Sequence, residues 1–193
     1  MKSTPGTILV VDDEFMNRML LATNLEEQGH SVKMAENGQK ALEMLYNISL
    51  DMVLLDLSMP KMDGFQVLEK IKAEITLQHI PVLIISGEDD MENIVRCIEM
   101  GAEDFLPKPF NSVLLRARIR TCLEKKRLRD LEIDYLRNVD LLTNAAAHID
   151  KGSFDPEYLV EVAVRPDKLG QLARVFQQMA REVLSRQQRL TQQ

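Results

Sequence analysis

Three acidic side chains stand side by side after an apolar run near the start of the chain. Asp12, Asp13 and Glu14 follow the run ILVV, and another acid, Asp56, follows the apolar run MVLL. Two carboxylates about 4 Å apart repel each other by roughly 1 to 4 kcal/mol, depending on how well water screens them. A hard dication such as Mg²⁺, which takes oxygen ligands, would offset this repulsion. For the triplet alone, helix capping is an alternative, because acids are favourable at a helix N-terminus.

Two further polar side chains with reactive chemistry follow apolar runs later in the chain. Ser86 follows the run VLII, and Lys108 closes the stretch DFLPK. Beside a bound dication, a carboxylate such as Asp56 acts as a nucleophile toward phosphorus, and an ammonium such as Lys108 neutralises charge on the transferred phosphoryl group. These residue types are therefore compatible with phosphoryl transfer to Asp56.

The elements that position these side chains alternate between short apolar runs and helical stretches, which is typical of an α/β fold with a parallel sheet. The expected strands are Ile8–Val11, Val32–Ala35, Met52–Leu55, Val82–Ile85 and Asp104–Leu106. Helices are expected near Met16–Gln28, Gln39–Tyr46, Phe65–Glu74, Met91–Met100 and from Asn111 onward. In such a sheet, ligands bind beyond the carboxyl ends of the strands, where the strand order reverses. If the first and third strands are neighbours there, Asp12, Asp13 and Asp56 converge on one crevice.

Four separated motifs resemble the receiver domain of bacterial two-component response regulators, over roughly residues 6–126. They are VVDDE, LLDLSMPKMDG, IISG and GAEDFLPKPF, in this order. The resemblance implies a flavodoxin-like fold with a five-stranded, parallel, doubly wound sheet. It also implies that the protein is a phosphoacceptor switch rather than an enzyme. The switch would take phosphate from a sensor histidine kinase or a phosphotransfer protein in a phosphorelay.

The resemblance further implies a metal set and a switch set. The residues that would hold Mg²⁺ are Asp12, Asp13, Asp56 and the main-chain carbonyl of Ser58. Lys108 would pair with the phosphoryl group on Asp56, Ser86 would donate a hydrogen bond to it, and Phe105 would be the aromatic residue that changes rotamer on activation. The Lys108–Pro109 bond resembles the cis peptide of the family.

After Phe110 both the charge and the pattern change. Residues 1–110 carry 19 acidic and 9 basic side chains, a net charge of −10, whereas residues 111–193 carry 11 acidic and 15 basic ones, a net charge of +4. No Gly or Pro occurs between Phe110 and Gly152, which predicts one long helix or two abutting ones. We therefore expect a receiver over residues 1–126 and a helical module over residues 127–193.

Two heptad series follow in the second half. The first comprises Leu128, Leu131, Tyr135, Leu142, Ala145 and Ile149, with polar Asn138 in one core position. The second comprises Leu169, Leu172, Phe176, Met179, Val183 and Leu190, interrupted by Arg186. Such narrow apolar seams favour a homodimeric coiled coil over packing back onto the first domain.

The stretch from VDLLTNAAAHIDKG to FQQMAREV is similar to a HAMP module, the helix–connector–helix unit that relays signals in membrane receptors. Gly152 opens the connector, and PDKLGQLARVFQQM follows the start of the second helix of that family, with Lys168 where a Glu is usual. The resemblance implies a parallel homodimer, since a relay needs both receivers at one end and both outputs at the other. A generic dimeric coiled coil is the alternative.

Composition narrows the remaining classes of protein. No apolar run approaches the roughly 20 residues of a membrane-spanning helix, and the start of the chain has no signal-peptide pattern, so we expect no membrane insertion and a cytoplasmic location. The basic stretch RARIRTCLEKKRLRD suggests nucleic-acid binding, but it lacks a helix-turn-helix pattern and interleaved aromatic residues, which favours a solvated helix face. Another alternative is the N-terminal regulatory part of a longer signalling enzyme, such as a nucleotide cyclase.

Overall fold

A computed structural model describes residues 5–87, 91–149 and 156–191. The chain divides into two compact units, Met1–Leu128 (unit 1) and Arg129–Gln193 (unit 2). Helix α5 (Ser112–Ile149) contributes to both, so the helical stretch predicted after Phe110 is one long helix. Among the described helices, α5 and α7 (Lys168–Thr191) included, none is apolar over a membrane-spanning length.

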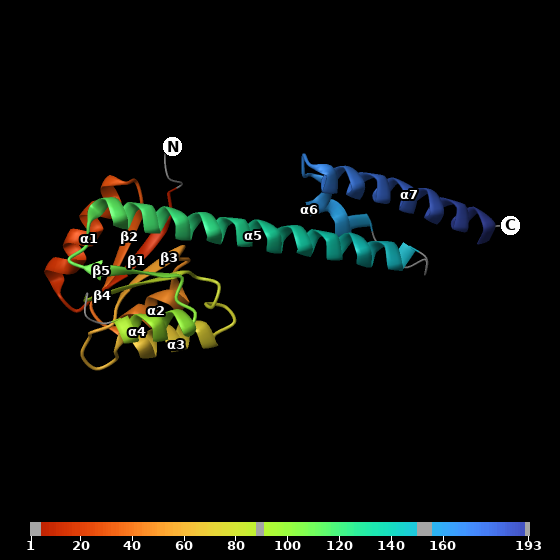
Figure 1. The fold of residues 1–193 in the computed structure, drawn as a ribbon. Coiled ribbons are helices and arrows are strands. Elements are labelled where there is room, and N and C mark those ends of the chain that lie inside the picture. Colours follow the sequence, from red (N-terminus) through yellow and green to blue (C-terminus); the bar gives the residue numbers. More distant parts are fainter. Residues whose placement is uncertain (1–4, 88–90, 150–155, 192–193) are drawn as a thin grey trace. The chain divides into compact units, whose positions relative to one another are not determined.

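Unit 1 is built on a five-stranded parallel sheet (Figure 1). The strands are β1 (Thr7–Val11), β2 (Ser31–Ala35), β3 (Met52–Asp56), β4 (Val82–Gly87) and β5 (Asp104–Lys108), in the order β2-β1-β3-β4-β5. This confirms the predicted doubly wound α/β fold. Strands β1 and β3 are neighbours, with Val11 beside Leu55. The strand order therefore reverses between them, as the predicted convergence of Asp12, Asp13 and Asp56 requires.

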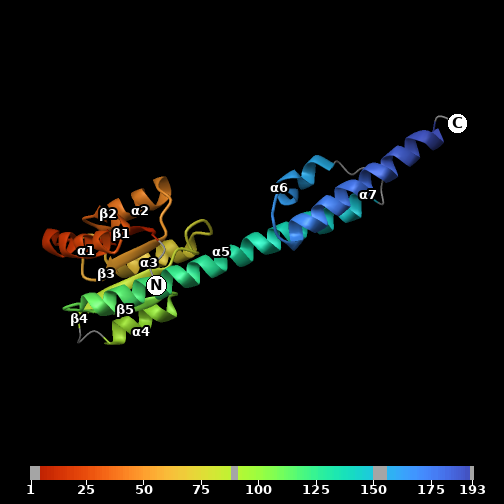
Figure 2. The ribbon, with the colours of Figure 1, turned by 90° about the horizontal axis from the view of Figure 1, so that it is seen from above.

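Helices cover both faces of this sheet (Figures 1 and 2). They are α1 (Phe15–Glu27) and the first part of α5 on one face, and α2 (Gly38–Asn47), α3 (Gly64–Ala73) and α4 (Met91–Glu99) on the other. Successive strand residues point to opposite faces, so Ile8 packs in the cluster under α1 and α5, and Leu9 in the other. Because both faces are covered, the central strands β1, β3 and β4 are buried over nearly all of their residues and read as apolar runs.

Helix α3 begins close to the end of β3, and glycine makes this approach possible. The Asp63 carboxylate accepts a hydrogen bond from the Gln66 backbone N–H at 2.9 Å, and the Gln66 side chain accepts one from the Asp63 backbone N–H at 3.3 Å. A Cβ on Gly64 would lie 2.3 Å from the backbone oxygen of Asp56, closer than atoms can pack. The segment MDG therefore ties the start of α3 to the residue that ends β3.

Unit 2 pairs the end of α5 with helix α7 (Lys168–Thr191). Between them lie the short helices η1 (Pro156–Leu159) and α6 (Val160–Ala163), whereas Gly152, expected to open the connector, lies outside the described residues. The end of α5 and helix α7 run side by side in the same direction (Figures 1 and 2). Arg165 connects these two helices, because its guanidinium forms salt bridges with Asp134 of α5 at 2.7 Å and with Asp167, just before α7, at 2.9 Å.

In the single chain, the predicted heptad seam of α7 is split into two stripes. The buried cluster of unit 2 comprises Leu142, Ala145, Leu159, Val162, Leu169, Ala173 and Ala180, with Phe176 packed against it. Leu172 and Met179 are exposed, although they belong to the predicted series, and Ala173 and Ala180 are buried, although they do not. Successive helix residues are about 100° apart, so Leu172 points about 60° away from Leu169, and one neighbouring helix covers only part of the apolar arc.

Several other residues of the two heptad series are also exposed in the single chain. These are Leu128, Leu131 and Tyr135 on α5 and Val183 on α7. The side chains of Ile149 and Leu190, which were assigned to the seams, lie outside the described part of the structure. The apolar pattern of the second half therefore exceeds what one chain buries.

Candidate functional site

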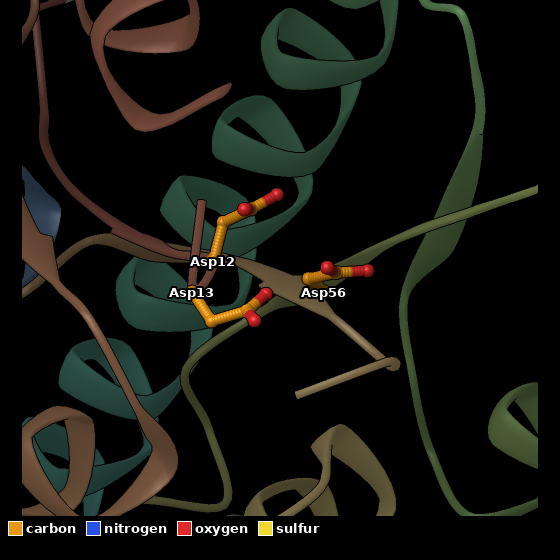
Figure 3. Close-up of side chains that lie close together, drawn as sticks. All are labelled: Asp12, Asp13 and Asp56. Carbon is orange, nitrogen blue, oxygen red and sulfur yellow. The ribbon is translucent and has the colours of Figure 1, made fainter. Parts of the chain in front are cut away.

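Asp12, Asp13 and Asp56 lie together at the carboxyl edge of the sheet (Figure 3). Asp12 follows β1, and Asp56 is the last residue of the neighbouring strand β3. Each of the three offers one carboxylate oxygen, and these oxygens lie within 4.8 Å of one another. Asp12 and Asp56 are buried, whereas Asp13 is exposed to solvent. The structure thus brings the three predicted carboxylates into one group that is reachable from one side.

Glu14, the third acid of the opening triplet, does not belong to this group. It is the N-cap residue of α1, but its side chain is exposed and makes no capping hydrogen bond. Its backbone N–H instead donates to Asp12 Oδ1 at 2.8 Å. Side-chain capping by Glu14 therefore does not explain the acidic triplet, and Asp12 is held by the turn that leads into α1.

The side chain of Lys108, the last residue of β5, reaches into the acidic group. Its Nζ lies 3.0 Å from Asp12 Oδ2 and 2.9 Å from Asp56 Oδ2. The Lys108–Pro109 peptide bond is cis, as the resemblance implies. One ammonium thus bridges the carboxylates of Asp56 and Asp12, at the ends of the neighbouring strands β3 and β1. These residues lie 52 and 96 positions earlier in the chain than Lys108.

Burial and this bridge shift two pKa values in the group. Burial raises the pKa of Asp56, and the hydrogen bond from Lys108 opposes this shift without cancelling it. For Lys108, burial lowers the pKa of the ammonium, but the hydrogen bonds and the charge attraction to Asp56 and Asp12 together outweigh burial, so the pKa lies above its ordinary value. Lys108 is therefore charged at neutral pH.

The donor set suits a hard dication. Asp12, Asp13 and Asp56 supply only oxygen ligands, and the single positive charge of Lys108 does not balance three carboxylates. Mg²⁺ prefers carboxylate and water oxygens and keeps several waters when it binds to proteins. The exposed side of the group, at Asp13, leaves access for those waters.

The remaining predicted site residues lie around this group. Ser86 is buried in β4, where it is paired in register with Pro107 of β5, one residue before Lys108. The Ser58 backbone N–H lies 3.4 Å from Asp56 Oδ1. Phe105 packs against the core in part, and the Arg118 guanidinium of α5 lies 5.7 Å from the centre of its ring.

Two residues beside the group, Asn17 and Arg18, were not singled out from the sequence. The Asn17 amide lies 3.2 and 3.3 Å from the two carboxylate oxygens of Asp12, and Arg18 Nη1 donates to the Asp12 backbone oxygen at 2.6 Å. For Arg18 a signal exists, because the spacing of three and seven residues to Leu21 and Leu25 places it on the buried face of α1. A charged residue in that register predicts a buried polar contact.

Comparison with known protein families places this site in a wider context. Residues 8–120 match the family model of the response regulator receiver domain. The chain belongs to the response regulator receiver family. The carboxylate group, Ser86 and Lys108 all fall within the matched residues, so the resemblance inferred from the four motifs is confirmed for the first part of the chain.

Several curated response regulators and related proteins are similar to this receiver. The chain is 35% identical over 143 residues to a probable transcriptional regulator ycf27 from Cyanidium caldarium, covering 74% of this chain and 56% of that protein. It is 38% identical over 133 residues to a probable cyclic di-GMP phosphodiesterase from Vibrio cholerae, covering 67% of this chain and 30% of that protein. The response regulator PleD from Caulobacter vibrioides is 39% identical over 150 residues, which cover 74% of this chain and 32% of PleD. The chain thus spans between about a third and about half of these relatives.

Solved structures agree with this assignment. NtrX from Brucella abortus superposes with a TM-score of 0.65 and 34% identity, covering 70% of this chain and 30% of that one. A putative response regulator from Chloroflexus aurantiacus superposes with a TM-score of 0.61 and 28% identity, covering 63% of this chain and 99% of that one. The receiver fold is therefore shared over about the first two thirds of the chain.

Proposed function

We propose that Asp56 is the phosphoacceptor of a two-component response regulator, and that a sensor histidine kinase, a phosphotransfer protein or a small phosphodonor supplies the phosphoryl group. The observation that carries this proposal is the position of Lys108 Nζ, 2.9 Å from Asp56 and 3.0 Å from Asp12. A nucleophilic carboxylate that contacts a cation and lies beside two further carboxylates suits in-line phosphoryl transfer.

In the proposed step, a carboxylate oxygen of Asp56 forms a bond to phosphorus while the bond between phosphorus and the donor breaks. Asp12, Asp13, Asp56 and the main-chain carbonyl of Ser58 are the groups that would hold Mg²⁺. When bound, Mg²⁺ supplies neutralisation of charge on the transferred phosphoryl group. Lys108 would stabilise the same charge, since its ammonium already contacts the acceptor carboxylate.

The proposed switch follows from the charge that is added. A phosphoryl group adds roughly −1.5 to −2 charges and three acceptor oxygens, and Lys108 in β5 and Ser86 in β4 are the donors proposed to bind it. Movement of Ser86 toward the phosphoryl group would change the space beside Phe105, which lies on the adjacent strand. The chain then acts as a phosphoacceptor switch and not as an enzyme with a separate substrate.

For residues 127–193, we propose a HAMP-like module that forms a parallel homodimer and changes its packing when the receiver is phosphorylated. Two features of unit 2 support this role: α7 runs in the same direction as the end of α5, and both helices keep exposed apolar side chains. Two chains together would supply four helices and cover both stripes of α7. A cytoplasmic location belongs to the same proposal.

A second candidate is that the chain regulates a catalytic or DNA-binding domain of a longer protein. It is favoured by the names of two relatives, a probable cyclic di-GMP phosphodiesterase and a probable transcriptional regulator, of which this chain spans only a part. In that case unit 2 would relay the state of the receiver to the output domain. Phosphorylation of Asp56 is common to both candidates.

The test is the intact mass of the chain after incubation with acetyl phosphate and Mg²⁺. Wild type should gain one phosphate, whereas Asp56→Asn and wild type in EDTA should gain none. Asp51→Asn is a matched control, because Asp51 lies just before the first residue of β3, at the opposite end of that strand from Asp56. Its carboxylate accepts a hydrogen bond from the Thr7 backbone N–H at 2.9 Å. Phosphate gained equally by Asp56→Asn, or equally in EDTA, would refute the proposal.

The role of Lys108 is tested separately with beryllofluoride, which imitates the phosphoryl group. Lys108→Ala should keep part of the binding but lose most of the changes that wild type shows in the amide spectra near Ser86 and Phe105. Identical changes in both proteins would mean that Lys108 does not transmit the added charge.

A further inference from the structure

The side chain of Asn17 contacts the acidic group, although the proposed function gives it no role. Asn17 lies in the first turn of α1, and its Nδ2 donates to Asp12 Oδ1 at 3.3 Å and Oδ2 at 3.2 Å. The next residue, Arg18, donates from Nη1 to the backbone oxygen of Asp12 at 2.6 Å. Two adjacent residues of one helix thus hold both the carboxylate and the backbone of the same aspartate.

Arg18 is buried without a bond to a carboxylate within the described residues. It is 9% exposed, and its other contact is the ring of Phe15, whose centre lies 5.8 Å from the guanidinium carbon. A buried charge costs free energy unless opposite charge or hydrogen bonds compensate it. Here the hydrogen bond to the Asp12 carbonyl compensates part of this cost, so the position of Arg18 is linked to that of Asp12.

Lys108 and Asn17 differ in how they respond to a cation beside Asp12. Both donate to Asp12 Oδ2, at 3.0 and 3.2 Å. The ammonium of Lys108 repels a dication bound to the same carboxylate. The amide of Asn17 is neutral and carries no such penalty. Asn17 and the backbone N–H of Glu14, 2.8 Å from Asp12 Oδ1, are therefore the donors compatible with a metal-bound Asp12.

We propose that Asn17 is a positioning residue that orients the Asp12 carboxylate for Mg²⁺, with Arg18 anchoring the backbone of the same aspartate. This inference rests on the proposed function, because it takes Asp12 as a metal ligand. Residues that hydrogen-bond to a metal ligand change metal affinity by about 10- to 100-fold when they are removed. For a neutral and half-exposed donor, we expect a smaller loss of about 3- to 10-fold.

The test is calorimetric titration of the unphosphorylated full chain with MgCl₂. Asn17→Ala should raise the Kd for Mg²⁺ about 3- to 10-fold. Asn24→Ala is the matched control on the same helix, where the amide donates to the Leu20 carbonyl at 2.9 Å, and it should bind like wild type. If Asn17→Ala also binds like wild type while Asp12→Asn loses binding, the inference fails and the proposed function survives. If Asp12→Asn binds Mg²⁺ as tightly as wild type, the proposed metal site itself is wrong.

A conservative variant separates orientation of Asp12 from general damage to the fold. Asn17→Ser keeps a hydrogen-bond donor at this position, so it should recover part of the Mg²⁺ affinity that Asn17→Ala loses. The Tm of both variants without metal should stay close to that of Asn24→Ala. An equal loss of affinity in both variants, together with an equally lowered Tm, would mean a structural role and overturn the inference.

Discussion

The two units of this chain bury their apolar residues to different extents. In unit 1, helices cover both faces of the sheet, and residues such as Leu54 and Leu83 are 0% exposed. In unit 2, the stripe of α7 that contains Ala173 is buried, whereas Leu172 remains 44% exposed. The core of unit 1 is therefore complete within one chain, whereas the apolar arc of α7 in unit 2 is only partly covered. The receiver is expected to be stable alone, and the second half to depend on association.

The largest expected effect compares one leucine in each unit. Leu83→Ala removes a fully buried side chain from the sheet, which should lower the free energy of unfolding of unit 1 by about 2 to 5 kcal/mol. Leu172→Ala should cost less than about 1 kcal/mol at concentrations where the chain is monomeric. Urea unfolding followed by circular dichroism checks both values. Equal costs would mean that the two units are packed alike.

A pair of charge substitutions separates the two stripes of α7. Phe176→Glu places a carboxylate against the buried cluster of unit 2 and should destabilise that unit by roughly 1 to 3 kcal/mol. Met179→Glu lies on the exposed stripe, so it should leave the helix content unchanged and weaken dimerisation. Light scattering and far-UV circular dichroism measure the two effects.

The control for this pair is a chain that ends at Lys126, which should be monomeric. A monomeric wild type, or a shortened chain as dimeric as the full one, would show that unit 2 is not the dimerising part. A Met179→Glu variant that dimerises like wild type would place the interface elsewhere on unit 2.

The close approach of Gly64 to the Asp56 backbone offers a test of how strongly the phosphorylation site depends on the position of α3. Gly64→Ala brings a Cβ to 2.3 Å from the Asp56 backbone oxygen, so α3 or β3 must shift, at a cost of about 1 to 3 kcal/mol. We also expect slower phosphorylation of Asp56 by acetyl phosphate and no change in dimerisation. Thermal unfolding and intact mass measure these effects, with Gly87→Ala as control, because a Cβ at Gly87 meets no described atom within 4 Å. A Tm equal to that of Gly87→Ala would contradict the prediction.

The smallest expected effect is the pH dependence that His30 gives to unit 1. Burial lowers the pKa of His30 below 6.5, and its Nδ1 accepts a hydrogen bond from the Gly6 backbone N–H at 3.2 Å. The unfolded chain then binds the proton more readily, so stability falls as the pH drops below about 6.5, by at most about 1.4 kcal/mol per pH unit. His30→Gln should flatten this dependence. An unchanged slope in His30→Gln would remove His30 as its cause.

The sequence alone determined the sheet and most of the site. Strands buried on both faces read as continuous apolar runs, so Ile8–Val11 and Met52–Leu55 were recognisable without any partner. Asp12 and Asp56 stand at the ends of those runs, and the rule that parallel sheets bind ligands at the carboxyl ends of their strands brings them together once β1 and β3 are neighbours, as the structure shows. The ends of β4 and β5 extend two residues beyond the prediction, to Gly87 and Lys108, because hydrogen bonding between strands continues past the apolar residues.

Only the tertiary structure decided how helices share their contacts. A helical pattern identifies an apolar arc, but it does not say which neighbour covers each part of that arc. This is why Leu169 and Leu172, both assigned to one seam, lie on different stripes of α7. The same limit applies to Asn17 and Arg18, because their contacts with Asp12 depend on how α1 packs beside the end of β1, which no local spacing specifies.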